Sequence, residues 1–273
     1  MLPVVAGNAL PGKPQSAASR QLVETALPAL GLALTDAQID MLLAYLDLIS
    51  KWTRVYNLTA VRDAGDMVTH HLLDCLAAMG PLAAHFERAR HLKLAGLKSD
   101  SGLKQDLEAK VKAKWEAKLE GKSEAGQGSR LLDVGSGAGL PGVVIAICFP
   151  GLSVTCVDTV AKKAAFIKQV ALTLKLPNLT GLHARVEALG APALHPFDVI
   201  CSRAFASLAD FTQWSSGALA PAGVWMAMKG KHPKDELAAR PRSVQVFHVE
   251  QLKVPALDAE RCIVWMRAAQ SVT

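Results

Sequence analysis

The sequence predicts an α/β fold built on a mainly parallel β-sheet. From residue 131 onward, short apolar runs alternate with helical stretches, which is the pattern of βαβ units. A glycine-rich turn, Gly135-Ser-Gly-Ala-Gly139, separates the first apolar run from the first helical one, as expected where a strand passes into a helix. The last two apolar runs, Val244–Val254 and Cys262–Arg267, flank Pro255 to Asp258. They predict a C-terminal antiparallel hairpin.

Before this region we expect a disordered tail followed by a small helical unit at residues 20–90. Residues 1–19 are rich in Ala, Pro, Gly and Ser, a composition that disfavours a packed structure. Thr35 and Gln38 form a capping box at the start of an amphipathic helix. Gly80-Pro81 predicts the end of a later helix. We therefore expect helices over residues 20–30, 35–52 and 66–79.

Residues 91–128 predict a charged helical insert. Within residues 98–122, seven Lys stand against five Asp or Glu, and apolar residues recur every four positions from Leu103 to Leu119. Gly121–Ser129 is a flexible Gly/Ser segment. Two interpretations remain open: a solvated helix packed by a narrow apolar stripe, or an arm that contacts nucleic acid. The near balance of charge favours the first.

The rest of the chain, residues 129–273, predicts the α/β domain itself. Helices are expected over Val143–Phe149 and Ala161–Lys175, with a turn at Pro221–Gly223. The five expected parallel strands are Leu131–Val134, Leu152–Val157, Leu179–His183, Phe197–Ser202 and Val224–Met228. Ligands of such sheets bind at the carboxyl ends of the strands. The residues that fall at those ends are Gly135, Asp158, Val186, Glu187, Arg203 and Lys229.

The glycine turn favours S-adenosylmethionine over a dinucleotide. The dinucleotide pattern G-x-G-x-x-G needs a glycine at position 140, and the residue there is Leu140. The pattern present is acid-x-Gly-x-Gly-x-Gly, which begins at Asp133. A pyrophosphate disfavours a nearby carboxylate, whereas S-adenosylmethionine carries an ammonium, a sulfonium and no phosphate, so an acid is tolerable. Asp158 ends the second strand, where an acid meets ribose hydroxyls.

Composition narrows the partners and the compartment. The formal net charge is +6 and the isoelectric point is near 9.1, which suits an anionic partner such as nucleic acid. The five cysteines form no C-x-x-C pair, so we expect a reducing compartment and no metal site. The chain begins without a signal-peptide pattern, and glycines and prolines interrupt its longest apolar stretch. We therefore expect a cytoplasmic protein with no membrane partner.

The exit of the fourth strand bears on the reaction. Ser202-Arg203-Ala204-Phe205 stands where a methyltransferase that acts on an exocyclic amine often has Asn-Pro-Pro-Tyr. Cys201 lies inside the strand and is expected to point into the core, which disfavours a cysteine nucleophile. The N7 atom of guanine has an available lone pair and needs no base before attack. Arg203 has two open roles, a contact to guanine or cofactor and a salt bridge. Phe205 has two as well, base stacking and the favoured core packing.

Taken together, these residues make the chain resemble the RsmG/GidB family of 16S ribosomal RNA (guanine-N7) methyltransferases. The resemblance covers roughly residues 20–90 and 129–268. The matching segments are Trp52–Asp63, Leu132–Gly142, Asp158 with Lys162 and Lys163, Ser202–Leu208, Met228–Gly230 and Val254–Glu260.

The resemblance implies a class I S-adenosylmethionine-dependent methyltransferase with a Rossmann-like fold, acting on a guanine N7 of 16S ribosomal RNA or of the small ribosomal subunit. The cofactor contacts that it implies are Gly135, Leu140, Val186, Glu187 and Arg203, to which the strand-end argument adds Asp158. Arg203 is also the expected catalytic residue. Two other functions stay open: a methyltransferase of the same fold that acts on a protein or small molecule, and a non-enzymatic nucleotide-binding module.

Overall fold

The computed structural model describes residues 17–56, 58–61, 63–94, 126, 128–190 and 195–269. Residues 1–16 of the expected tail and most of the insert expected at 91–128 lie outside the described residues. None of the described helices combines the length and the apolarity that a membrane span requires.

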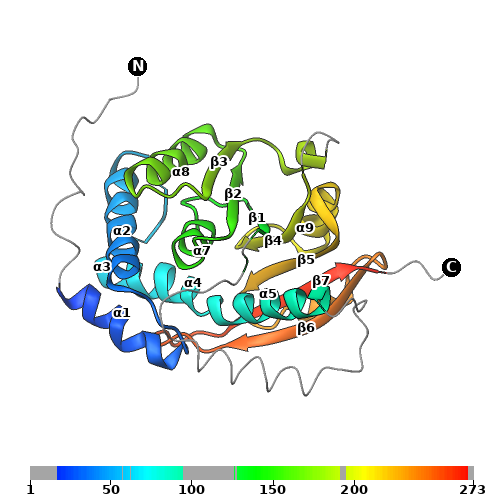
Figure 1. Ribbon diagram of the computed structural model, residues 1–273, viewed down its shortest axis with the longest axis horizontal. Coiled ribbons are helices and arrows are strands. Elements are labelled where there is room, and N and C mark those ends of the chain that lie inside the picture. The colour runs from blue at the N-terminus through cyan, green and yellow to red at the C-terminus, as the bar shows by residue number, and fades with distance from the viewer. Residues whose placement is uncertain are drawn as a thin grey trace.

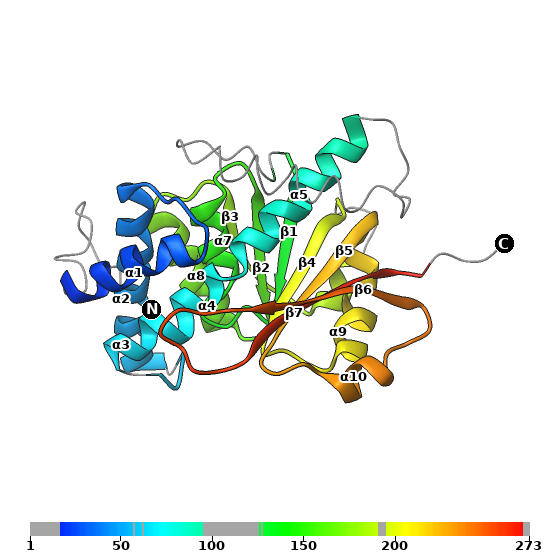
Figure 2. The ribbon, with the colours of Figure 1, turned by 90° about the horizontal axis from the view of Figure 1, so that it is seen from below.

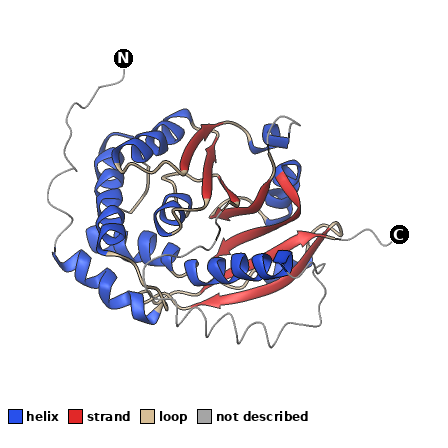
Figure 3. Cartoon of the chain, in the orientation of Figure 1, coloured by secondary structure: helices blue, strands red, loops and turns tan. Residues whose placement is uncertain are grey.

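Seven strands form one mixed sheet in the order β3-β2-β1-β4-β5-β7-β6. The first five strands in this order run parallel, and β7 pairs antiparallel with both β5 and β6 (Figures 1 and 3). The predicted parallel sheet with a C-terminal antiparallel hairpin is therefore confirmed. The strands are β1 Arg130–Val134, β2 Ser153–Asp158, β3 Leu179–His183, β4 Phe197–Arg203, β5 Leu219–Lys229, β6 Val244–Leu252 and β7 Arg261–Ala268.

Successive residues of each strand face two separate hydrophobic clusters, as the pleat of a strand requires. Leu131 belongs to the first cluster and Leu132 to the second. Figure 1 shows α7 (Gly142–Cys148) and α8 (Ala161–Thr173) on one side of the sheet and α9 (Leu208–Ser215) on the other. Figure 2 shows the short helix α10 (Lys234–Ala238) beside α9. Both faces are thus covered, which explains why the central strands are mainly apolar.

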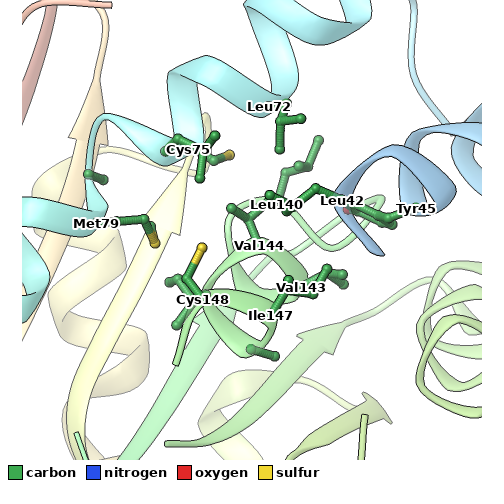
Figure 4. Packing of buried hydrophobic residues seen from close by; sticks show 14 of the residues in the cluster. Leu42, Tyr45, Leu72, Cys75, Met79, Leu140, Val143, Val144, Ile147 and Cys148 are labelled. Atoms are coloured by element: carbon green, nitrogen blue, oxygen red, sulfur yellow. The ribbon is translucent and has the colours of Figure 1, made fainter. Parts of the chain in front are cut away.

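The helices that precede the sheet share its first hydrophobic cluster. They are α1 Ala17–Ala29, α2 Asp36–Tyr56, α3 Ala64–Met67, the π-helix η1 Val68–Leu73, α4 Asp74–Leu76 and α5 Met79–Leu94. Figure 4 shows Leu42 and Tyr45 of α2, Leu72 of η1 and Cys75 of α4 around Leu140 and the start of α7. Burial of these apolar side chains joins the N-terminal helices to the glycine turn.

The capping box at Thr35 is confirmed, whereas two expected boundaries are wrong. The Gln38 backbone N–H donates to Thr35 Oγ1 at 3.2 Å, and the Thr35 N–H donates to Gln38 Oε1 at 3.0 Å. Gly80-Pro81 does not end a helix, because Pro81 lies in the first turn of α5, where its missing N–H costs no helical bond. The turn expected at Pro221–Gly223 lies inside β5, near a register shift in its pairing with β4.

Three small helical elements complete the described structure and had no counterpart in the prediction. The 3-10 helices η3 (Val186–Gly190) and η4 (Ser216–Ala218) follow β3 and α9, and α10 follows β5. Each is only three to five residues long, which is too short for a helical period to show in the sequence.

Candidate active site

The carboxyl ends of β1, β2 and β4 meet at the point where the strand order reverses. Val134 of β1 pairs with Val157 of β2, and Asp133 pairs with Cys201 of β4. The glycine turn that leaves β1 therefore lies between Asp158 on one side and Arg203 on the other. This is the crevice in which open α/β sheets bind ligands.

The three glycines of the turn serve different purposes. All have positive φ: 66° at Gly135, 58° at Gly137 and 89° at Gly139. A Cβ at Gly135 would stand 2.3 Å from the Phe205 ring, and one at Gly139 would stand 2.5 Å from Val143 Cγ2. A Cβ at Gly137 would meet nothing closer than a backbone oxygen at 3.9 Å. Gly135 and Gly139 are thus required by packing within the protein, whereas Gly137 presents an open side to a ligand.

Asp158 holds the glycine turn against the end of β2. Its Oδ2 accepts a hydrogen bond from the Gly137 N–H at 3.0 Å, and its Oδ1 accepts one from the Val160 N–H at 2.8 Å. Lys163 Nζ lies 3.7 Å from Oδ2. A carboxylate oxygen has two lone pairs, so Oδ1, which accepts one hydrogen bond from Val160, keeps one for a ribose hydroxyl. The residue therefore lies where the sequence predicted it, and it also shapes the turn.

Leu140, Val186 and Glu187 lie near the same edge but present different groups. The Leu140 side chain is buried among α2, η1 and α7 (Figure 4). Val186 is buried in the second hydrophobic cluster, and Glu187 is exposed at the start of η3. Of the three, only the Glu187 side chain is exposed.

Arg203 leaves β4 toward the N-terminal helices. Its Nη1 donates to Asp74 Oδ2 at 2.9 Å and to the His70 carbonyl at 3.0 Å. Arg261 Nε donates to the other oxygen of Asp74 at 2.7 Å. The salt bridge expected as one role of Arg203 is present, and the carboxylate belongs to α4.

The segment after Arg203 is anchored by contacts from α9, α10 and β5. The Phe205 ring packs edge-on against Phe211 at 6.3 Å and Trp214 at 5.9 Å between ring centroids. Lys229 Nζ donates to the Ala206 carbonyl at 3.2 Å and to Glu236 at 2.8 Å. The packing role favoured for Phe205 is thus present, and the ring also closes the space beside Gly135.

Asp133 and Cys201 lie beneath the turn, out of reach of a ligand. Asp133 is fully buried, its Oδ2 accepts the Gly142 N–H at 2.9 Å, and burial raises the pKa of its carboxyl to about 7. Cys201 Sγ lies 3.7 Å from Asp133 Oδ1, and burial raises the pKa of its thiol far above the usual range. Cys201 points into the core as predicted, so it offers no thiolate.

The histidines of η1, His70 and His71, contribute to the packing of the helix and form no metal site with the other described residues. His71 Nε2 lies 2.7 Å from Thr59 Oγ1, and burial, with the nearby Arg203 charge, lowers the pKa of the ring to about 4. His71 is therefore neutral near pH 7. The described ranges contain no group of three or more His, Cys, Asp or Glu side chains placed to hold a metal ion.

Two residues of this site were missed by sequence reasoning. The Tyr45 hydroxyl donates to the Ala138 carbonyl at 2.6 Å and so ties α2 to the glycine turn. Asp74 reaches Arg203 and Arg261 from the opposite end of the chain. The available signal for Asp74 was an acid inside the otherwise apolar run Leu72 to Leu76, since acids are rarely buried unless paired.

These groups suit S-adenosylmethionine better than a phosphate-bearing ligand. The turn opens at Gly137, the Asp158 carboxylate accepts from the Gly137 N–H, and Glu187 stands exposed after β3. Carboxylates accept hydrogen bonds from ribose hydroxyls and favour an ammonium or sulfonium. The residues present therefore fit the cofactor that the sequence predicts.

Comparison with known proteins assigns the family. The model of the GidB family, described as rRNA small subunit methyltransferase G, matches residues 38–90 and 119–264. The chain belongs to this family. The GidB match includes the glycine turn, Asp158 and the segment after Arg203, and it omits residues 91–118 of the charged insert.

Curated members of the GidB family align over nearly the whole chain. The "Ribosomal RNA small subunit methyltransferase G" of Polaromonas naphthalenivorans (strain CJ2) is 60% identical over 91% of this chain and 95% of its own. The protein of that name from Polaromonas sp. (strain JS666) is 62% identical over 90% of this chain and 92% of its own. Among solved structures, TrmN from Thermus thermophilus covers 71% of this chain and 53% of its own, with a TM-score of 0.44 and 17% identity.

Proposed function

We propose that this protein transfers a methyl group from S-adenosylmethionine to N7 of a guanine in 16S ribosomal RNA. The observation that carries the proposal is the family match, because it spans every strand end that lines the crevice. Relatives about 60% identical over nine-tenths of the chain are named as ribosomal RNA small subunit methyltransferases. The basic net charge of +6 fits an RNA substrate.

Methyl transfer to N7 requires the protein mainly to bind the cofactor and the guanine and to align them. When bound, S-adenosylmethionine supplies an electrophilic methyl group on a sulfonium. The open side of Gly137 would admit the cofactor, and the carboxylates of Asp158 and Glu187 would accept hydrogen bonds from its hydroxyls. Phe205 and Tyr45 hold the turn in shape from opposite sides. Such pre-organisation lowers the entropic part of the barrier.

N7 is the guanine atom that can be methylated without a general base or a nucleophilic side chain. Its lone pair lies in the ring plane and needs no deprotonation before attack. Cys201 is buried with a raised thiol pKa, and His71 is buried and neutral. Arg203 keeps Nε and Nη2 to donate to guanine O6, one of the acceptors by which arginine recognises guanine, and the N7 lone pair stays free for attack. A donor at O6 also orients the base for attack.

We further propose that the protein acts in the cytoplasm on 16S RNA, either naked or within the small subunit. The test is transfer of labelled methyl groups from S-adenosylmethionine to naked 16S RNA, small subunits and 23S RNA, with Arg203→Ala as the inactive comparison. We expect label in 16S RNA or in the small subunit and a loss of at least tenfold in Arg203→Ala. Label in ribosomal protein instead of RNA would support a different substrate class, and binding without transfer would support a non-enzymatic module.

Residues 20–90 and 129–273 form the core of the proposed functional unit, with a charged insert between them and a tail before them. Residues 17–19 of the expected tail belong to α1, and residues 91–94 of the expected insert belong to α5. The gap of the family match at 91–118 supports this division. Deletion of residues 98–124 should leave the affinity for S-adenosylmethionine unchanged by calorimetry. A sharp loss of affinity in the deletion variant would place the insert within the cofactor site.

A further inference from the structure

Asp74 is a buried carboxylate between two arginines from distant parts of the chain. It is 3% exposed and begins α4, directly after the π-helix η1. Oδ2 accepts from Arg203 Nη1 at 2.9 Å, and Oδ1 accepts from Arg261 Nε at 2.7 Å. A carboxylate loses several kcal/mol of hydration on burial unless charged partners replace the water. Two arginines, from β4 and β7, supply that replacement here.

The backbone around Asp74 is fixed as well as its side chain. The Asp74 N–H donates to the carbonyls of His71 and Thr69, the second of which is the i−5 bond of the π-helix. The carbonyl of His70 in the same helix accepts from Arg203. Irregular helical turns of this kind often occur at functional sites. The π-helix and the residue that follows it therefore offer two acceptors, the His70 carbonyl and the Asp74 carboxylate, to one guanidinium nitrogen.

This arrangement determines which donors of Arg203 remain for a ligand. A guanidinium has five N–H donors, two of them on Nη1. Both recorded hydrogen bonds of Arg203 within the described residues use Nη1. Nε–H and one N–H of Nη2 then form one planar edge of the guanidinium, and the described residues hold no acceptor for it. Because the guanidinium is rigid and planar, fixing Nη1 fixes the direction of that edge.

We propose that Asp74 is a positioning residue that holds Arg203 in the orientation required for methyl transfer, and that Arg261 steadies Asp74. This inference rests on the proposed function, because the ligand that Arg203 contacts is the cofactor or the guanine. It deepens that function by placing one determinant of activity in the N-terminal helices, outside the sheet that forms the crevice.

Asp74→Asn is the informative substitution, since it keeps the shape of the side chain and removes its charge. The amide presents only one oxygen, so one of the two arginines loses its acceptor. The matched control is Asp198→Asn. Asp198 lies on the same strand as Arg203 but near its amino end, where Oδ2 accepts the Arg130 N–H at 2.9 Å. Both variants remove one carboxylate, and only Asp74→Asn removes the ion pair that holds Arg203.

The experiment is a double-mutant cycle on methyl transfer and on S-adenosylmethionine affinity, with wild type, Asp74→Asn, Arg203→Ala and the double variant. We expect kcat to fall about tenfold or more in Asp74→Asn, whereas Asp198→Asn retains the wild-type rate. In the Arg203→Ala background, Asp74→Asn should cause no further loss, because its effect acts through Arg203. A merely structural role predicts that the two losses multiply, and that outcome would overturn the proposal, as would a wild-type kcat in Asp74→Asn.

Two further arms keep the outcomes distinct. If Asp74→Asn does not fold, Arg261→Gln tests the same idea from the half-buried start of β7, and we expect a several-fold loss of kcat with the melting temperature little changed; an unchanged kcat contradicts the proposal. If wild-type protein binds S-adenosylmethionine and methylates no RNA, the proposed function fails. In that case the double-mutant cycle on S-adenosylmethionine affinity still tests whether Asp74 positions Arg203. Non-additive losses of affinity support the positioning role, and additive losses of affinity reject it.

Discussion

Gly137→Ala tests whether the glycine turn is open to the cofactor where the structure places the opening. The new methyl group would enter a space whose nearest atom is a backbone oxygen at 3.9 Å. It therefore meets no protein atom closely, and the remaining internal cost is the conformation. A non-glycine residue at a φ of 58° costs about 1–2 kcal/mol. The fold should survive with a modest loss of stability.

Cofactor affinity should respond much more strongly. If S-adenosylmethionine lies against the backbone of Gly137, a Cβ occupies space that the ligand needs. We expect Kd to rise about tenfold or more, which corresponds to about 1.4 kcal/mol. Titration calorimetry with S-adenosylmethionine or S-adenosylhomocysteine measures this directly, and urea unfolding measures the stability of the same preparation.

Gly31→Ala is the matched control for the conformational cost. Gly31 follows α1, has a φ of 64°, and a Cβ there would meet nothing within 4 Å. It should lose similar stability and retain wild-type affinity. If Gly137→Ala also retains wild-type affinity, the open side of the turn is not the cofactor contact and the reasoning is refuted.

Three other outcomes follow from the same site. Gly135→Ala should destabilise the protein by about 1–3 kcal/mol more than Gly137→Ala, because its Cβ would stand 2.3 Å from the Phe205 ring; equal urea midpoints would contradict this. Tyr45→Phe should lose about 1–3 kcal/mol, because it leaves the buried Ala138 carbonyl without its 2.6 Å donor; an unchanged midpoint would refute the role of Tyr45. Burial raises the pKa of Asp133 from 3.8 to about 7. Between these two pH values the folded state therefore binds more protons than the unfolded state. As the pH rises through this range, the contribution of Asp133 to the free energy of unfolding falls by up to about 4 kcal/mol. Asp133→Asn removes that term, so the stability of wild type relative to the variant should decline between pH 4 and 7; a pH-independent difference would show that Asp133 does not titrate there. His71 and His85, whose pKa values burial lowers to about 4, act in the opposite direction and are common to both proteins.

Local patterns in the sequence predicted the strands and the edge of the sheet at which the candidate site lies. Central strands covered on both faces are mainly apolar, so Leu131–Val134 and Phe197–Ser202 were recognisable within one residue of their observed ends. The positions of Asp158 and Arg203 followed from topology, since parallel strands end at one edge. The turn was predictable because three alternate glycines imply positive φ.

Long-range contacts were not predictable in the same way. Tyr45 reaches Ala138 across 93 residues, and Asp74 reaches Arg203 across 129. Nothing in the local pattern of α2 or α4 specifies those partners. Pro81 and Pro221 misled for a related reason: tertiary packing placed one in a first helical turn and the other beside an irregular pairing, where proline is tolerated. The N-terminal helices were expected, but their particular contacts to the glycine turn and to Arg203 were not.

The central claim is the atom that receives the methyl group. The most direct measurement is mass spectrometric identification of the methylated nucleoside in 16S RNA after reaction with the purified protein, with RNA made from 7-deazaguanosine as the comparison. We predict 7-methylguanosine in ordinary RNA and no methylation when N7 is replaced by carbon. Methylation of the 7-deaza RNA, or a methyl group on another atom of guanine or on another base, would contradict the account.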